Sequence, residues 1–200
     1  MKRIIVGMSG ATGQIYGIRL LQYLRELPEI ELHLVISDWA KRTIALETDW
    51  TTGAVEALAH RVYDSHDQAA AISSGSFSRA AMVIAPCSVK TLSAIANSYN
   101  DSLMIRAADT TLKERKPLIL AFRETPLHAG HLRLMAQAAD IGAVIAPPVP
   151  SFYNNPRTID DLVDYTIYRL MDIMGLPSKR AKRWEGLERR RLSEGDGRDQ

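Results

Sequence analysis

The sequence predicts an α/β fold: a Rossmann-like (flavodoxin-like) three-layer sandwich, in which a parallel sheet carries helices on both faces. Short apolar runs alternate along the 200 residues with stretches whose apolar residues recur at helical spacing. Some runs are apolar throughout, which is typical of strands buried on both faces. Strands that alternate with helices are joined by right-handed crossovers into a parallel sheet. The length suits one domain of this kind.

The N-terminal part of the chain predicts strands at residues 4–8, 31–36 and 62–63 and helices at 13–27, 39–47 and 52–60. Pro28 ends the first helix, and we expect Asp38 to cap the second. Thr51 or Thr52 can cap the third. Residues 64–79 give no clear signal.

The C-terminal part predicts strands at 80–85, 118–122 and 143–146 and helices at 92–96, from after Leu127 to about 141, and at 159–174. Gly175 is expected to end the last helix before Pro177. No element is assigned between residues 97 and 117. We therefore expect a single α/β domain over 1–175, followed by an arm at 176–200.

Composition and charge restrict the class of protein. The arm holds eight Lys or Arg against five Asp or Glu, which leaves 17 against 18 in the rest of the chain. Acidic residues interrupt the basic runs and no recognition motif accompanies them, so we expect no nucleic-acid partner. No apolar stretch approaches the length of a membrane span, and the lone Cys87 suits a reducing compartment. The sequence predicts a soluble, cytoplasmic protein without a membrane partner.

The first strand runs into a turn with three glycines, Gly7, Gly10 and Gly13, and two hydroxyls, Ser9 and Thr12. Glycine allows backbone to approach a ligand closely, and the free amides at the start of the next helix attract an anion. The spacing fits neither the dinucleotide fingerprint nor the P-loop. The turn therefore predicts a mononucleotide site.

Further polar residues follow the other predicted strands, at the edge where parallel sheets bind ligands. Hydroxyl groups occur there at Ser9, Thr12, Ser37, Ser88 and Thr91. Each could be a helix cap, but five at one edge favour a polar ligand site. The Arg123-Glu124 pair follows a buried strand, where the guanidinium could bind phosphate and the carboxylate could move a proton. The alternative for this pair is a surface ion pair.

Other candidates are weaker. Cations for a phosphorylated substrate are available at Lys90, Arg106, Lys113 and Arg169, although most such residues are only solvated. His128 and His131 share a helix face, but they lack the third protein ligand that zinc sites need, so no metal is expected. Cys87 could be a reactive thiol, and we favour a small buried residue instead.

Four motifs in order resemble the flavin prenyltransferase family over nearly the whole chain: Gly10-Ala11-Thr12-Gly13, Pro86-Cys87-Ser88-Val89-Lys90-Thr91-Leu92, Arg123-Glu124-Thr125-Pro126-Leu127, and Pro147-Pro148 through Phe152-Tyr153-Asn154. Other stretches, at residues 39–41, 66–69, 73–77 and 183–187, are similar to the subgroup called phenylacrylic acid decarboxylase, which is also known as an accessory component of hydroxyarylic acid decarboxylases. The older name implies decarboxylation, whereas the family's chemistry implies cofactor synthesis.

The resemblance implies transfer of a dimethylallyl group from dimethylallyl monophosphate to N5 of reduced FMN, with ring closure at C6. The prenylated FMN would serve a separate UbiD-type decarboxylase of aromatic or α,β-unsaturated acids. The family forms large homo-oligomers, commonly dodecamers, with active sites at subunit junctions.

The resemblance also implies roles for individual residues. FMN would contact Gly10, Ala11, Thr12, Ser37, Ser88, Val89, Lys90, Thr91 and Arg123. The prenyl phosphate would be held by Lys113, Arg123, Tyr153 and Arg169, with Arg106 and Glu47 contributed across subunit contacts. Glu124 would carry the proton for the leaving phosphate. Trp184 would help to exclude water, which would make the arm a candidate lid.

Two alternatives stay open. A flavin-dependent cysteinyl decarboxylase of the same fold would carry a histidine in its first helix region and a P-x-M-N-x-x-M-W stretch. Residues 13–30 contain no histidine, and Pro147-Pro148-Val149-Pro150 stands where the second motif would be. A non-catalytic FMN-carrying subunit would not need Glu124, Lys113, Tyr153 and Arg169.

Overall fold

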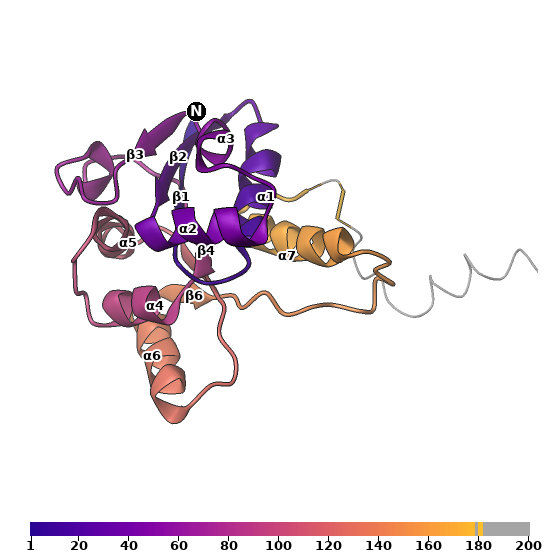
Figure 1. Cartoon of the computed structure of the whole chain (residues 1–200). Coiled ribbons are helices and arrows are strands. Elements are labelled where there is room, and N and C mark those ends of the chain that lie inside the picture. The colour runs from indigo at the N-terminus through magenta and orange to yellow at the C-terminus, as the bar shows by residue number, and fades with distance from the viewer. Residues whose placement is uncertain (179, 182–200) are drawn as a thin grey trace, which may run out of the picture.

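The computed structural model describes residues 1–178 and 180–181. Six parallel strands form one sheet in the order β3-β2-β1-β4-β5-β6 (Figure 1). This is the strand order of the Rossmann fold, so the predicted architecture is confirmed. Successive strands are added to one side of β1 up to β3 and to its other side from β4 onwards, and at such a switch point the carboxyl ends of adjacent strands leave a crevice for a ligand.

The strands are β1 (Lys2–Met8), β2 (Ile30–Ile36), β3 (Arg61–Tyr63), β4 (Ala81–Cys87), β5 (Leu118–Phe122) and β6 (Ala143–Ile145). The helices are α1 (Gln14–Arg25), α2 (Asp38–Glu47), α3 (Thr52–Glu56), α4 (Val89–Ala96), α5 (Leu103–Lys113), α6 (Ala129–Asp140) and α7 (Ile159–Ile173), with a 3-10 turn at Ala71–Ser73.

Alternate side chains of the strands fill two separate cores. On one face Ile4, Val6 and Met8 of β1 pack with the apolar sides of α1, α2 and α7. On the other face Ile5 of β1 and Met82 of β4 pack with α4, α5 and α6. Figure 1 places α1 and α7 together on one side of the sheet and α4, α5 and α6 on the other. The helices cover both faces of the sheet and leave the carboxyl ends of the strands accessible to a ligand.

Three local predictions need correction. The sequence assigned no element to residues 97–117, where α5 lies with Leu103, Ala107 and Thr111 buried. Helix α3 ends at Glu56, short of the predicted residue 60. Ser37, not Asp38, caps α2, because its Oγ accepts from Ala40 N at 3.2 Å.

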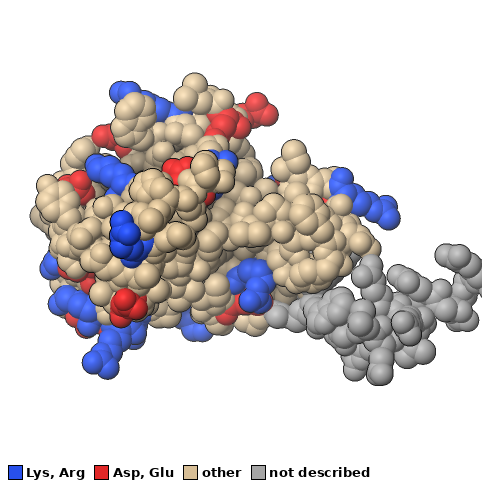
Figure 2. All heavy atoms as spheres, turned by 90° about the horizontal axis from the view of Figure 1, so that it is seen from below, with Lys and Arg blue, Asp and Glu red and all other residues tan. Residues whose placement is uncertain are grey.

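Residues 179 and 182–200 of the predicted arm lie outside the described residues, so the division of the chain into a domain and an arm stays a prediction. Gly175 follows the last helix at φ +71°, a conformation that glycine tolerates best. On the face seen in Figure 2, Lys and Arg side chains are scattered among uncharged residues and do not form one continuous patch. No helix in the described part of the chain is long and apolar enough to cross a bilayer.

Candidate active site

A cavity of about 550 Å³ opens at the carboxyl edge of the sheet. Its wall is built from six segments: the turns after β1, β2, β3, β4 and β5, and the start of α5. The predicted site residues in the wall are Gly10, Ser37, Ser88, Val89, Lys90, Thr91 and Glu124. A cavity of this size is typical of sites for cofactor-sized ligands.

The N-terminus of α4 faces this cavity. Ser88 caps the helix, with its Oγ accepting from Thr91 N at 3.3 Å and donating to Thr91 Oγ1 at 3.1 Å. The amides of Val89 and Lys90 have no acceptor among the described residues. The Lys90 side chain is exposed, and its Nζ lies 3.3 Å from Asp101 Oδ2. Free amides at a helix start attract an anion, so this turn can hold a phosphate.

Ser9 is a structural link rather than a ligand group. It is 2% exposed, donates its hydroxyl to Pro86 O at 2.9 Å, and accepts from Ser88 N at 2.8 Å. Its own amide also donates to Pro86 O at 3.2 Å. The hydroxyl therefore joins the turn after β1 to the turn after β4.

The N-terminus of α1 already holds an anion from the same chain. Glu47, the last residue of α2, accepts from Gly13 N at 2.7 Å, from Gln14 N and from Thr12 Oγ1 at 2.6 Å. Gly13 permits the turn because its φ of +91° is one that other residues rarely adopt. The glycine turn thus differs from the prediction: the amides expected to meet a phosphate contact a carboxylate. These contacts of Glu47 are made within one chain, and its contribution across a subunit contact stays a prediction.

Asp38 and His66 form a pair at the mouth of the cavity that the sequence analysis missed. His66 Nε2 lies 2.9 Å from Asp38 Oδ2, and both residues line the cavity. The hydrogen bond to Asp38 raises the pKa of His66, and the same bond lowers the pKa of Asp38. The sequence signal was weak, because residue 66 lies in the stretch without a clear pattern.

Arg123 and Glu124 follow β5 directly and are both exposed. The Arg123 guanidinium makes no hydrogen bond or ion pair with a described residue. Burial raises the pKa of Tyr16 on α1, and the positive charge of Arg123 opposes that effect, so the guanidinium lies towards α1. Glu124 accepts from Thr125 N at 2.9 Å and contributes to the cavity wall. The two residues are not a surface ion pair with one another.

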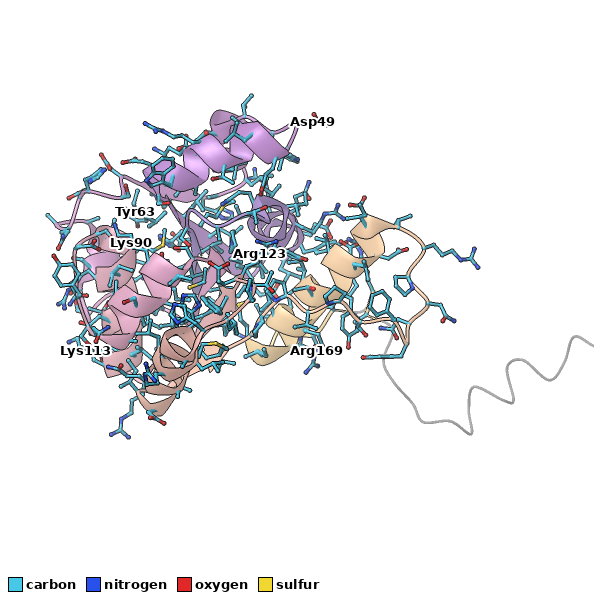
Figure 3. All side chains as sticks on the ribbon, turned by 60° about the horizontal axis from the view of Figure 1, so that its bottom comes forward. Asp49, Tyr63, Lys90, Lys113, Arg123 and Arg169 are labelled. Carbon is cyan, nitrogen blue, oxygen red and sulfur yellow. The ribbon has the colours of Figure 1, made fainter. Side chains whose placement is uncertain are left out.

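Tyr153 and Arg169 belong to a second group of residues, around Tyr165 of α7. The Tyr153 ring meets Tyr165 of α7 edge to face at 5.7 Å, and their hydroxyls are hydrogen-bonded. Burial raises the pKa of Tyr165, and the charge of Arg169 acts against it. Arg169 itself donates to Asp172 at 3.2 Å. Figure 3 places Arg123 and Arg169 on the same side of the molecule.

Lys113 and Arg106 do not join these residues within one chain. Lys113 is the last residue of α5 and precedes β5, whereas Arg123 follows β5, so about 16 Å of strand separates them. Figure 3 accordingly has Lys113 well apart from Arg123 and Arg169. Arg106 pairs with Asp109 on its own helix at 3.0 Å. Within one chain Lys113 therefore lies away from Arg123, and the guanidinium of Arg106 pairs with Asp109.

The remaining candidates are settled by their positions. Cys87 is fully buried, and burial raises the pKa of its thiol, so it packs as a small core residue. His128 caps α6 through Nδ1 and stacks on His131 at 3.6 Å. No group of three or more His, Cys, Asp or Glu within residues 1–178 and 180–181 could hold a metal ion. Trp184 lies outside the described residues.

The start of α5 supplies cavity residues that the sequence analysis missed altogether. Ser102, Met104 and Ile105 all line the wall. Ser102 is the N-cap of α5, with its Oγ 3.5 Å from Ile105 N. A serine followed by apolar residues at helical spacing is a helix-start signal, so this element was accessible from sequence.

Comparisons with known proteins give a consistent result. The family profile called Flavoprotein matches residues 1–171. Flavin prenyltransferase UbiX of Escherichia coli is 57% identical over 188 residues, which are 93% of this chain and 100% of that protein.

Two crystal structures are similar to this chain. AnUbiX in complex with FMN and dimethylallyl pyrophosphate has a TM-score of 0.91 and 47% identity, covering 93% of this chain and 98% of that one. A dodecameric FMN-dependent Ubix-like decarboxylase from Escherichia coli has a TM-score of 0.90 and 49% identity, covering 92% and 100%. With its fold, its cavity and relatives matched over nearly their full length, the chain belongs to the UbiX-type flavin prenyltransferase family.

Proposed function

We propose that this protein transfers a dimethylallyl group from dimethylallyl monophosphate to N5 of reduced FMN, with ring closure at C6, to make prenylated FMN. The observation that carries the proposal is the open N-terminus of α4 in a cavity shared with Glu124. The chain is also 57% identical to a flavin prenyltransferase. FMN is a substrate in this reaction and needs a site that holds it while its ring stays accessible.

For FMN we propose the cavity, with the phosphate at the amides of Val89 and Lys90. The other candidate anion site, the start of α1, is taken by Glu47. The hydroxyls of Ser37 and Thr91 and the backbone of residues 10–12 would contact the rest of the flavin. These contacts are uncharged, so the negative charge of the phosphate is met mainly by helix amides and by Arg123.

For the prenyl phosphate we propose Arg123, Tyr153 and Arg169. A phosphate leaves readily when fixed cations meet the charge that develops on it, so guanidinium groups can replace a metal ion. Arg123 directly precedes Glu124 of the cavity wall, and we propose that its guanidinium contacts both substrates. Glu124 is placed to carry a proton to the departing phosphate.

Lys113 and Arg106 would reach the same phosphate only from another copy of the chain. We therefore propose a homo-oligomer whose active sites lie at subunit junctions, with twelve copies as in the Escherichia coli relative. The separation of Lys113 from Arg123 along β5 supports this arrangement. The prenylated FMN would pass to a separate UbiD-type decarboxylase, and we propose the cytoplasm as the place of both steps.

One experiment tests the function directly. Purified protein is incubated without oxygen with reduced FMN and dimethylallyl monophosphate, and the flavin is examined by mass spectrometry. We expect a flavin heavier by one isoprene unit, and no such product when the prenyl phosphate is omitted. Unmodified flavin that stays bound would overturn the enzyme and favour an FMN-carrying subunit.

A second experiment tests the decarboxylase activity that the older family name implies. The same protein is given an aromatic acid or a cysteinyl peptide, with no other protein present. We expect no carbon dioxide, because the proposed chemistry occurs on the flavin. Release from either acid would favour a decarboxylase in place of a prenyltransferase.

A further inference from the structure

The loop at residues 74–77 has no part in the proposed reaction, yet it packs against the helix end that bears Lys113. Arg79, 3% exposed, holds the loop in place. Its Nη1 donates into α5, to Ala107 O at 3.1 Å and to Thr110 Oγ1 at 2.8 Å. Its Nε donates to Phe77 O at 3.2 Å, and Nη2 donates to Ser74 O.

These bonds join both ends of the loop to one helix. The guanidinium is planar and rigid, so its donors hold the loop and α5 in a fixed relation. Burial without a carboxylate partner lowers the pKa of Arg79, with the charge of Glu114 opposing it, and the bonds to carbonyls and hydroxyls satisfy the guanidinium instead. The loop and the last turns of α5 therefore form one unit.

Gly75 lies at the middle of this loop, directly under the Lys113 side chain. A Cβ added to Gly75 would overlap Glu114 Oε1 and would lie 2.9 Å from Lys113 Nζ and 3.1 Å from Lys113 Cε. Lys113 and Glu114 are themselves paired at 3.2 Å. The Lys113–Glu114 ion pair therefore occupies the space that a side chain at position 75 would need.

We propose that Gly75 is a positioning residue for Lys113: its lack of a side chain lets the Lys113–Glu114 pair lie on the clamped loop, from which Lys113 is presented to the prenyl phosphate of a neighbouring copy. The inference rests on the proposed role of Lys113. The φ of Gly75 is not in the left-handed region, so the backbone conformation does not require a glycine there.

The geometry makes Gly75→Ala a selective change. The atoms that a new methyl group would meet are the ends of two long, half-exposed side chains, so they move and the fold stays. The flavin cavity is lined by the opposite end of α5, at Ser102 and Ile105. We therefore expect prenyl phosphate binding to weaken while FMN binding stays the same.

Gly53→Ala is the matched control. Gly53 also has no positive φ, and a Cβ there would have no heavy atom within 4 Å. For each variant the KM for dimethylallyl monophosphate, kcat, the Kd for FMN and the thermal midpoint are measured on the full oligomer. We expect Gly75→Ala to raise KM about tenfold, the effect of weakening one charge-assisted hydrogen bond. Gly53→Ala should match the wild type in both kinetic constants.

A double variant separates this inference from the function on which it rests. In the Lys113→Ala background we expect Gly75→Ala to have no further effect on KM, because the side chain it displaces is gone. If Lys113→Ala leaves KM and kcat unchanged, the role of Lys113 fails and the inference fails with it. If Lys113→Ala impairs the enzyme but Gly75→Ala behaves like Gly53→Ala, only the positioning role is overturned. A Gly75→Ala variant that also binds FMN more weakly and has a lower thermal midpoint would overturn the positioning role as well.

Discussion

Thr12 donates its hydroxyl hydrogen to Glu47 Oε2 at 2.6 Å, although the two residues stand 35 positions apart in the chain. The second oxygen of the same carboxylate accepts from Gly13 N. A side chain at the end of α2 thus caps the start of α1. This contact explains why the glycine turn does not present its amides to a ligand.

We expect Glu47→Ala to lower the free energy of unfolding by about 1–2 kcal/mol, the usual cost of losing an N-cap. Urea denaturation of the variant and the wild type measures the difference. Glu29→Ala is the control, because Glu29 is exposed and its side chain has no hydrogen bond or ion pair within the described part of the chain. Equal midpoints for the two variants would mean that Glu47 contributes no cap.

Glu124→Gln tests the proton carrier. The amide has the size of the carboxylate but cannot transfer a proton, so we expect kcat to fall by about 10²-fold or more while the Kd for FMN stays unchanged. Anaerobic single-turnover experiments that follow the prenylated product give the rate. A variant that turns over as fast as the wild type would remove Glu124 from the proton path.

The subunit junction can be tested with two impaired variants. In a mixed oligomer of Lys113→Ala and Glu124→Gln chains, some junctions combine the native Lys113 of one copy with the native Glu124 of another. We therefore expect co-expressed, differently tagged chains to be more active than either variant alone. Purification through both tags selects the mixed oligomers. Mixed oligomers no more active than their parents would mean that the two residues do not act across copies.

Stability should depend on pH through His33. This residue is 2% exposed, with Nδ1 2.9 Å from Tyr63 Oη and Nε2 3.4 Å from Glu31. Burial lowers the pKa of His33, and the nearby Glu31 carboxylate opposes the shift. Between the ordinary histidine pKa and this lowered value, the unfolded chain binds more protons than the folded one.

The free energy of unfolding should therefore fall as pH drops through that window, by at most about 1.4 kcal/mol per pH unit, and this contribution should become constant below the folded pKa. Urea denaturation of the wild type and of His33→Asn, from about pH 8 to about pH 5, isolates the effect. Asn keeps a polar partner for Tyr63 but does not titrate. Parallel curves for the two proteins would exclude His33 as the source.

The strands were predictable because burial on both faces makes them apolar throughout. β5 lies at Leu118–Phe122 as predicted, and β4 differs by only a few residues. Helix α5 was not predicted although Ser102 marks its start, because after Leu103, Met104 and Ile105 its buried side consists largely of small or hydroxyl residues such as Ala107, Ala108 and Thr110. Small and hydroxyl side chains fit closely against a sheet, but they give little hydrophobic signal.

The wall of the candidate site was partly predictable, since strand ends in a parallel sheet share one edge. Ser37, Ser88 and Glu124 lie together for that reason. Contacts that depend on tertiary packing could not be predicted from the sequence. Examples are the bond from Gly13 N at the start of α1 to Glu47 and the pair of Asp38 and His66. The set of phosphate-binding cations stays a prediction, and Lys113 and Arg123 stand at opposite ends of one strand, so they would meet one phosphate only across two copies of the chain.

The hydroxyl of Ser9 spans two turns that are made at different times during synthesis. On a ribosome the first turn emerges early, but its partners Pro86 and Ser88 follow 77 and 79 residues later. Glu124, which completes the cavity wall, emerges later still. A nascent chain that ends before Glu124 therefore cannot form the complete pocket, and flavin can enter a finished site only after most of the sheet has been translated.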